Sequence, residues 1–240
     1  MRYAVIGDIH GNLSALQVVL NDISENGVDC ILCVGDIVGY GANPNICVEL
    51  VREMCDGIVS GNHDCGVAGT MDMSYFNADA RDAVAWTSER LSQGDLDFLA
   101  DLPMTAQLDD IYVVHGSPRY PESFSYIQTL YDARLGFSGF DEKVGFMGHS
   151  HVPMIFMNTD PVDYFMVSEF DLPRQRQILI NVGSVGQPRD LDSRASYVLF
   201  DSEKRRVQLR RLEYDLDAAA DAIREAGLPE TNAQRLYWGR

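Results

Sequence analysis

Residues that bind metal ions gather in five short motifs of this chain. All five histidines lie in these motifs, each with glycine, aspartate or asparagine close by. The motifs are Asp8-Ile9-His10, Gly35-Asp36, Gly61-Asn62-His63-Asp64, His115-Gly116 and Gly148-His149-Ser150-His151. A lone histidine more often has a structural role, but five out of five in such motifs indicate one shared metal site. The D-x-H and H-x-H spacings also let alternate residues of an extended segment bind one ion.

Each motif follows a short apolar run that is typical of a β-strand. In the first part of the chain these runs are Tyr3–Ile6, Ile31–Val34 and Gly57–Val59. Helical spacing of apolar residues between Leu13 and Ile23, and again from Pro44 to Val51, separates them. This alternation predicts a parallel α/β unit. Ligands bind at the carboxyl ends of strands in such sheets, so the motifs are expected to meet there.

Beyond the third motif the pattern changes to two helices, expected at Phe76–Leu91 and Leu96–Leu99, and then to closely spaced strands. We expect these strands at Ile111–Val114, Val144–Met147, Met154–Met157, Tyr164–Val167, Ile178–Ile180, Tyr197–Phe200 and Val207–Leu212. A last helix is expected from Leu216 to Ala226, with Gly227 ending it. No repeat or linker interrupts the chain, so we expect one domain over residues 1–240, built of two packed sheets flanked by helices.

In this order and spacing the five motifs resemble those of the calcineurin-like metallophosphoesterases. The segment from Asn181 to Arg189, NVGSVGQPR, is similar to a later segment of the small bacterial and archaeal phosphodiesterase-type members. The resemblance implies an α/β fold in which two mixed β-sheets pack as a sandwich with helices on both outer faces. It also implies a metal-dependent phosphoric ester hydrolase.

The resemblance assigns a role to most of the motif residues. It places one metal ion on Asp8, His10, Asp36 and His151, and a second on Asp36, Asn62, His115 and His149. Asp36 is then the bridging carboxylate. His63 is expected to face the leaving group as an imidazolium, and Asp64 is expected to orient it.

Two divalent ions roughly 3.5–4 Å apart lower the pKa of a bridging water and hold both oxygens of an in-line displacement at phosphorus. A carboxylate is a suitable bridge because it has two oxygens and a negative charge. The mixed ligands favour manganese, with iron, nickel or zinc as alternatives, over calcium or magnesium alone. The five cysteines are odd in number and predict no disulfide framework, and we expect Cys30 and Cys33 to be core residues, because they lie in an apolar run typical of a buried strand and no second C-x-x-C follows.

Simpler interpretations exist for single residues. Asp36 is compatible with a loop cap, Gly61-Asn62 with a plain turn and Asp64 with a helix cap. The whole set outweighs these alternatives, because independent caps and turns do not explain why every histidine belongs to it.

The substrate is less well defined by the sequence. The stretch Gly35–Pro44 has no arginine, which weakens a phosphoprotein phosphatase or a dinucleoside polyphosphate hydrolase, because no bidentate guanidinium follows the Gly-Asp motif. We expect a small phosphoester, with phosphodiesters ahead of phosphomonoesters. The candidate substrate-binding residues are Asn12, Tyr40, Arg119 and Arg189, although a surface salt bridge is the favoured alternative for both arginines. A scaffold that has lost catalysis is disfavoured because every ligand is present.

Composition limits the remaining classes. The 240 residues carry 19 Lys and Arg against 36 Asp and Glu, a net charge of −17. Such a surface repels nucleic acid, which argues against a nuclease. No apolar run approaches the ~18 residues of a membrane span and no signal sequence is evident, so we expect a cytoplasmic protein. The aromatic segment Tyr120–Gly139 is expected to form core packing or a self-association surface in an oligomer, ahead of a wall over the site.

Overall fold

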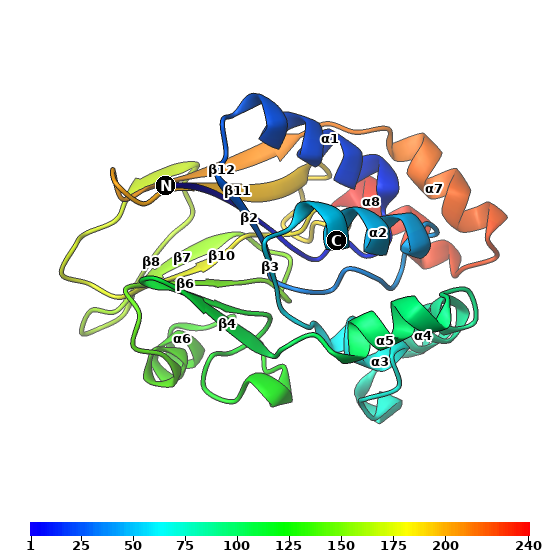
Figure 1. The fold of residues 1–240 in the computed structure, drawn as a ribbon, viewed down its shortest axis with the longest axis horizontal. Helices are drawn as coiled ribbons and strands as arrows, with labels where there is room; N and C mark the ends of the chain where they lie inside the picture. The colour runs from blue at the N-terminus through cyan, green and yellow to red at the C-terminus, as the bar shows by residue number, and fades with distance from the viewer.

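The computed structural model describes residues 1–240 as two six-stranded β-sheets packed face to face, with helices outside them (Figure 1). In the first sheet the order is β3-β2-β1-β11-β12-β9, and in the second it is β4-β5-β6-β10-β7-β8. Both sheets are mixed, because parallel strands lie next to antiparallel ones in each. The structure therefore confirms the expected fold.

Strand bounds follow the apolar runs of the sequence. The first sheet contains β1 (Arg2–Ile6), β2 (Cys30–Cys33), β3 (Gly57–Ile58), β9 (Glu169–Asp171), β11 (Ala195–Asp201) and β12 (Arg206–Leu212). The second contains β4 (Thr105–Leu108), β5 (Ile111–Val114), β6 (Val144–Met147), β7 (Met154–Met157), β8 (Asp163–Phe165) and β10 (Ile178–Asn181). β1, β2 and β3 run parallel, as do β5, β6 and β10.

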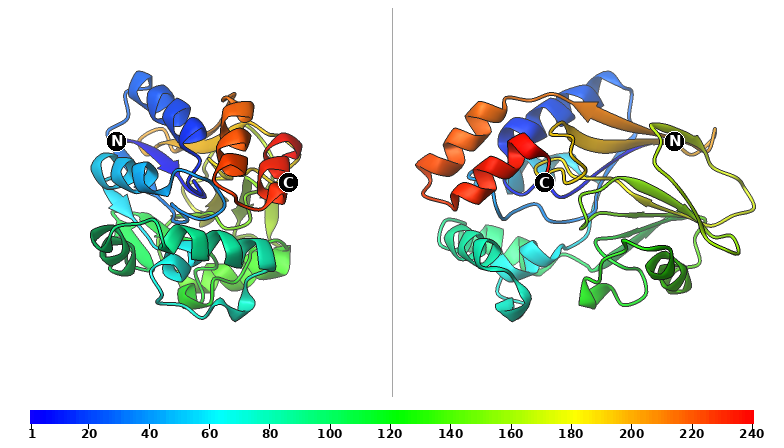
Figure 2. Two further views of the ribbon diagram at one scale, coloured as in Figure 1. Left: turned by 90° about the vertical axis from the view of Figure 1, so that its right-hand side faces the viewer. Right: turned by 180° about the vertical axis from the view of Figure 1, so that it is seen from behind.

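Helices lie outside the two sheets (Figures 1 and 2). They are α1 (Leu13–Glu25), α2 (Pro44–Met54), α3 (Asn62–Val67), α4 (Ala78–Ser88), α5 (Gln93–Ala100), α6 (Leu130–Gly136), α7 (Leu216–Glu225) and α8 (Glu230–Trp238), with 3-10 turns η1 (Met73–Tyr75), η2 (Pro121–Ser123) and η3 (Phe137–Gly139). The helices α1 and α2 lie over the first sheet, α6 lies on the second, and α3, α4 and α5 lie beyond the strand ends. None of these helices has the length and apolar character needed to cross a lipid bilayer.

Three apolar clusters hold the layers together. Strand β1 shows the arrangement, because Tyr3 and Val5 point between the sheets while Ala4 and Ile6 pack under the helices of the first sheet. A third cluster joins the outer face of the second sheet to α6. Successive side chains of a strand point to opposite faces, and both faces are covered here. This explains why the strands read as continuous apolar runs. All five cysteines are free.

Several short elements were not expected from the sequence. They are α3, α6, α8, β4 and β9. The strand expected at Tyr164–Val167 is shorter and begins earlier, at Asp163. These segments are short or lie at sheet edges, where local apolar periodicity is weak and tertiary contacts decide the conformation.

A polar contact ties helix α1 to the first sheet. Asp22 accepts hydrogen bonds from the Tyr197 hydroxyl at 2.5 Å and from two nitrogens of the Arg210 guanidinium at 2.7 and 3.0 Å. Partial burial by itself raises the pKa of Asp22, but the bonds from Arg210 and Tyr197 hold it below its usual value. The ionised carboxylate therefore stabilises the folded state.

We expect Asp22→Asn to lower the free energy of unfolding by about 1–3 kcal/mol, because hydrogen bonds to a charged group are lost. Since the pKa of Asp22 is depressed in the folded state, the decrease in the free energy of unfolding should be greatest above pH ~4 and should become smaller as the pH falls below that value. Urea unfolding at pH 7 and pH 3 measures it. The control is Asp82→Asn on α4, because Asp82 is exposed. An equal effect of both substitutions would contradict the assignment.

Candidate metal centre

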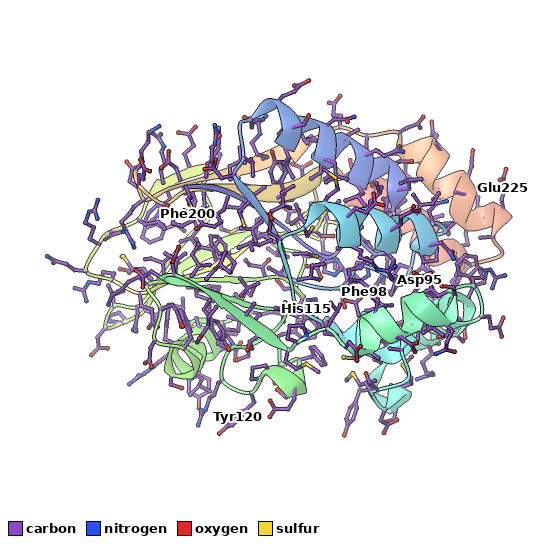
Figure 3. All side chains as sticks on the ribbon, viewed as in Figure 1. Asp95, Phe98, His115, Tyr120, Phe200 and Glu225 are labelled. Carbon is purple, nitrogen blue, oxygen red and sulfur yellow. The ribbon has the colours of Figure 1, made fainter.

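The five motifs meet at one edge of the sandwich, where the parallel strands of both sheets end. The loops after β1, β2 and β3 come from one sheet, and those after β5 and β6 come from the other. Two groups of buried ligand atoms form there, Asp8, His10, Asp36 and His151 in one group and Asp36, His115 and His149 in the other. Figure 3 shows His115 near the middle of the molecule, between the two halves.

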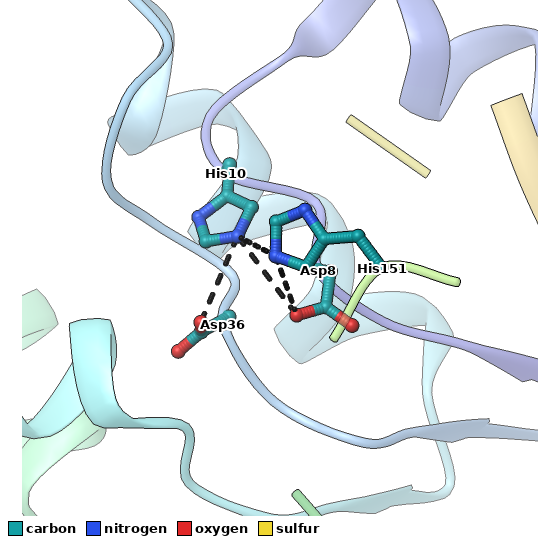
Figure 4. Close-up of side chains that lie close together, drawn as sticks. All are labelled: Asp8, His10, Asp36 and His151. Atoms are coloured by element: carbon teal, nitrogen blue, oxygen red, sulfur yellow. Dashed lines mark hydrogen bonds and ion pairs between the residues drawn. The ribbon is translucent and has the colours of Figure 1, made fainter. Parts of the chain in front are cut away.

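In the first group two histidines face two carboxylates (Figure 4). The His10 Nε2 atom lies 3.6 Å from Asp36 Oδ2 and 3.9 Å from Asp8 Oδ1. The His151 Nε2 atom lies 3.2 Å from Asp8 Oδ1 and 3.1 Å from His10 Nε2. These four side chains thus point at a common centre.

The second group is built around His115. Its Nε2 atom lies 3.3 Å from Asp36 Oδ2, 3.1 Å from His149 Nδ1 and 3.2 Å from the side-chain oxygen of Asn62. The structure therefore brings Asn62 to the same centre as His115 and His149. Asp36 Oδ2 faces both groups, and this is the geometry that a bridging carboxylate needs.

Backbone carbonyls set the direction of three of the four rings. Each of these rings presents Nδ1 to a carbonyl oxygen, and so its Nε2 atom is left facing the centre. The pairs are His10 with Val38 at 3.1 Å, His115 with Val34 at 2.8 Å and His151 with Gln187 at 2.6 Å. His149 is reversed and presents Nδ1 to the centre.

The chain turns sharply at these ligands. Five ligand residues have positive φ angles, an uncommon backbone conformation for residues other than glycine: Asp8, His10, Asp36, His149 and His151. Such conformations persist at functional sites when surrounding contacts enforce them. Two glycines also make room, because a Cβ atom at Gly61 would collide with Asp36 and one at Gly148 would collide with Asp8.

The charges of the site favour a cation. The carboxylates of Asp8 and Asp36 are buried, and neither forms an ion pair with lysine or arginine. Burial by itself raises the pKa of Asp36, but His115 and His63 hold it well below its usual range. An ionised carboxylate in such a place needs an opposite charge. The nitrogen and oxygen donors that converge here fit divalent transition metals.

Asp64 does not contact the His63 ring through any hydrogen bond. Instead, its carboxylate accepts bonds from the backbone N–H groups of Asp36, Ile37, Val38 and Gly61 at 2.8–3.2 Å. Burial and the nearby Asp36 charge raise the pKa of Asp64 to about 7. Asp64 therefore caps α3 and holds the Asp36 loop, as the helix-cap interpretation expected.

His63 lies beside His10 of the first group, with ring centres 4.9 Å apart, and lines an adjoining pocket. Its backbone N–H donates to Asp36 Oδ1 at 2.8 Å, and its buried Nδ1 atom has no partner. Burial, with the nearby Arg189 charge, lowers the pKa of His63 to about 4. These surroundings favour the neutral form of the ring, and the expected imidazolium role stays a prediction.

The four candidate substrate-binding residues have different surroundings in the structure. Asn12 is used structurally, because its oxygen caps α1 at Ala15 and its amide donates to Gly186. Tyr40 packs between the rings of His10 and His63 and lines the pocket.

The two arginines also differ. Arg119 is exposed and lies over the ring of Tyr120, and Figure 3 shows Tyr120 at the lower edge of the molecule. Arg189 lies next to the site, with its guanidinium 5.6 Å from the ring centre of Tyr40 and its Nε atom buried without a partner. Only Arg189 is therefore placed near the metal centre.

Sequence reasoning missed residues that support the ligands. Asn181 donates to Gly148 and to Ser150, and the Ser184 hydroxyl donates to the Asp8 carbonyl. Tyr126 stacks on His149 with ring centres 3.9 Å apart. The NVGSVGQPR segment and the aromatic segment after Tyr120 were the available signals, but neither indicates which ligand it contacts.

Comparison with known proteins agrees with this geometry. Residues 1–205 match the family model of the calcineurin-like phosphoesterase superfamily domain. The chain therefore belongs to the calcineurin-like phosphoesterase superfamily. Members are metallophosphoesterases, which use divalent metal ions, and this chain is accordingly a hydrolase of phosphate esters whose Asp and His groups are candidate metal ligands.

Relatives align over the whole chain. The structure of a metallophosphoesterase from Sphaerobacter thermophilus is 40% identical, covers 100% of this chain and 99% of its own, and superimposes with a TM-score of 0.90. The uncharacterized protein MJ0912 of Methanocaldococcus jannaschii is also 40% identical, over 99% of this chain and 98% of its own length. The hypothetical protein PH1004 from Pyrococcus horikoshii OT3, 21% identical, shares the fold with a TM-score of 0.80 over 100% of this chain and 98% of its own.

We expect Asp64→Asn to weaken metal binding about 10–100-fold, as the loss of an outer-shell partner does elsewhere. Both carboxylate oxygens of Asp64 accept hydrogen bonds, whereas an asparagine amide has only one acceptor oxygen. The loop that carries Asp36 would therefore shift. Calorimetric titration of metal-free protein with Mn²⁺ measures the change. Asp101→Asn, at an exposed position after α5, is the control. Unchanged metal affinity with lost turnover would instead support an orienting role toward His63.

Proposed function

We propose that this chain is a dinuclear metal-dependent phosphodiesterase. The observation that carries the proposal is the position of Asp36 Oδ2, 3.6 Å from His10 and 3.3 Å from His115, so that one oxygen faces both ligand groups. Asn62 completes the second group through its side-chain oxygen. Manganese is the favoured ion, with iron, nickel and zinc as alternatives, because imidazole and carboxylate ligands suit these metals.

When bound, two divalent ions supply a water-derived nucleophile at neutral pH and hold the phosphate oxygens for in-line displacement. The protein residues provide the rest of the machinery. Asp8 and Asp36 supply the negative charge that binds the ions, and the carbonyl-oriented rings are fixed in advance. This limits the reorganisation needed during the reaction.

His63 is proposed to handle the proton of the leaving group. Its pKa of about 4 reflects burial above all, and an anionic phosphate beside the ring would raise that pKa because opposite charges favour the protonated form. The substrate would thus create the acid that its own leaving oxygen needs. Arg189 is proposed to contact a phosphate oxygen, because its buried Nε atom has no partner in the protein.

The charge of the adjoining pocket supports diesters ahead of monoesters. Neither lysine nor arginine lines it, and Glu122 is its single charged residue apart from histidine. A phosphodiester has one negative charge near neutral pH, whereas a monoester has about two. The diester therefore meets less repulsion beside this carboxylate.

We also propose that residues 1–240 form one domain. The family model ends at residue 205, but β12 pairs with β11 and β9, and α7 packs against α1 and α8. The C-terminal segment thus completes the first sheet and its helical cover.

We expect chelator-treated protein to hydrolyse bis(4-nitrophenyl) phosphate only after metal is restored, with Mn²⁺ among the most effective of Mn, Fe, Ni, Zn and Mg. Asp36→Asn should abolish this activity, because it removes charge from both ligand groups. The visible absorbance of the released 4-nitrophenolate measures turnover, and the metal content of the protein is determined alongside it. Asp82→Asn is the matched control and should retain activity.

Other outcomes are informative. Hydrolysis of 4-nitrophenyl phosphate without diester cleavage would identify a phosphomonoesterase. Binding of one ion per chain would contradict the dinuclear centre. Absence of turnover with all five metals would contradict the proposed enzyme.

His63→Ala should lower turnover about 10²–10⁴-fold, the usual contribution of a general acid, while metal content stays unchanged. The substitution keeps the backbone N–H that donates to Asp36. His151→Ala is the contrasting variant and should lose metal together with activity. Loss of metal from His63→Ala would contradict the role in proton transfer.

A further inference from the structure

A pocket of about 420 Å³ adjoins the metal centre. Tyr40, Asn62, His63 and His149 form the part nearest to the ligands. The volume lies within the ~300–1,000 Å³ typical of sites for small organic ligands. A group that enters this pocket therefore lies beside the phosphate that the metal centre is proposed to bind.

Aromatic side chains line the pocket. Tyr75 and Phe76 come from the segment before α4, and Phe124 and Tyr126 come from the segment after η2; these four residues are the aromatic walls. Phe76 and Phe124 are only 8% and 7% exposed. These two rings are therefore held in place by their surroundings.

The aromatic walls contact the histidines of the site. The Phe76 ring centre lies 5.1 Å from that of His63, and the Phe124 ring centre lies 5.9 Å from that of His115. Tyr126 stacks on His149 with an angle of 14° between the planes. The pocket and the metal centre thus share their boundary residues.

Charge distinguishes this pocket from a site for polyphosphates. Glu122 is the only acidic side chain of its lining, and no lysine or arginine lines it. A second phosphate in the pocket would meet a carboxylate and no lysine or arginine. Planar uncharged rings instead gain from stacking on aromatic walls.

We propose that the pocket binds an uncharged planar aromatic group of the substrate, an aryl or nucleobase group linked to the scissile phosphate. The inference rests on the proposed function, because the metal centre must hold the phosphate. The aromatic walls then act as the specificity determinant, and they favour aromatic phosphoesters over small alkyl esters and over polyphosphates.

A binding experiment on the Mn²⁺-loaded wild-type protein tests the proposal without any substitution. Adenosine 5′-monophosphate and ribose 5-phosphate share the same phosphate and differ by the base. Calorimetry should show the nucleotide binding roughly 3–10-fold more tightly, the range expected for aromatic stacking. Adenosine 5′-diphosphate should bind no more tightly than the monophosphate.

Equal affinity for the nucleotide and the sugar phosphate would overturn the aromatic site. Tighter binding of the diphosphate would overturn the charge argument. Binding of neither phosphate would remove the phosphate site itself, and the proposed function would then fail together with this inference.

A kinetic experiment separates the two proposals further. Phenyl 4-nitrophenyl phosphate and methyl 4-nitrophenyl phosphate have the same leaving group and differ in the remaining ester group. Phe76→Leu and Phe124→Leu should each lower the phenyl-to-methyl ratio of kcat/KM roughly 3–10-fold. The control Tyr164→Leu, which changes a 54% exposed tyrosine on β8, should leave the ratio unchanged.

Hydrolysis of both esters with an unchanged ratio in both Phe variants would overturn the inference and leave the proposed function intact. Absence of hydrolysis of either ester by the wild-type protein would instead refute the proposed function. Circular dichroism and metal content confirm that the variants fold, and the binding experiment decides the question if they do not.

Discussion

The buried carboxylate of Asp36 is the constraint on which the site depends. Its Oδ1 atom accepts the His63 backbone N–H, and its Oδ2 atom faces both ligand groups. A carboxylate removed from water is costly unless hydrogen bonds and opposite charges compensate. Asp64 therefore holds the Gly35-Asp36 loop by accepting backbone hydrogen bonds. Gly61 can approach this loop closely because glycine has no side chain.

Hydrogen bonds from the surrounding backbone and side chains also fix the other candidate ligands. Backbone carbonyls in the loops after β2 and β10 orient three of the histidine rings, and Asn181 holds the loop that carries His149 and His151. Left-handed backbone conformations at the ligands are sustained by these contacts. Rigid strands therefore position a strained set of loops, and this is how a fold keeps a catalytic geometry fixed before substrate arrives.

The site also has to bind an anionic substrate within a protein of negative net charge. The chain has a net charge of −17, which repels phosphate at long range. In the proposed enzyme, bound cations and Arg189 provide the local attraction, and the aromatic pocket adds binding that does not depend on charge. Substrate selection by such a protein would rest on the ester group more than on additional phosphates.

Sequence motifs by themselves determined the candidate ligand residues and most of the strands and helices, because residue type and apolar periodicity are local properties. The family, the two-sheet fold and the convergence of the histidine motifs followed from them. Only the tertiary structure decided that Asp64 binds the Asp36 loop, that the Asn12 amide binds the Gly186 carbonyl, and that Phe76 and Phe124 share one pocket. These pairings join segments far apart in the chain, and they depend on how loops close around the sheet edge, for which no local pattern exists.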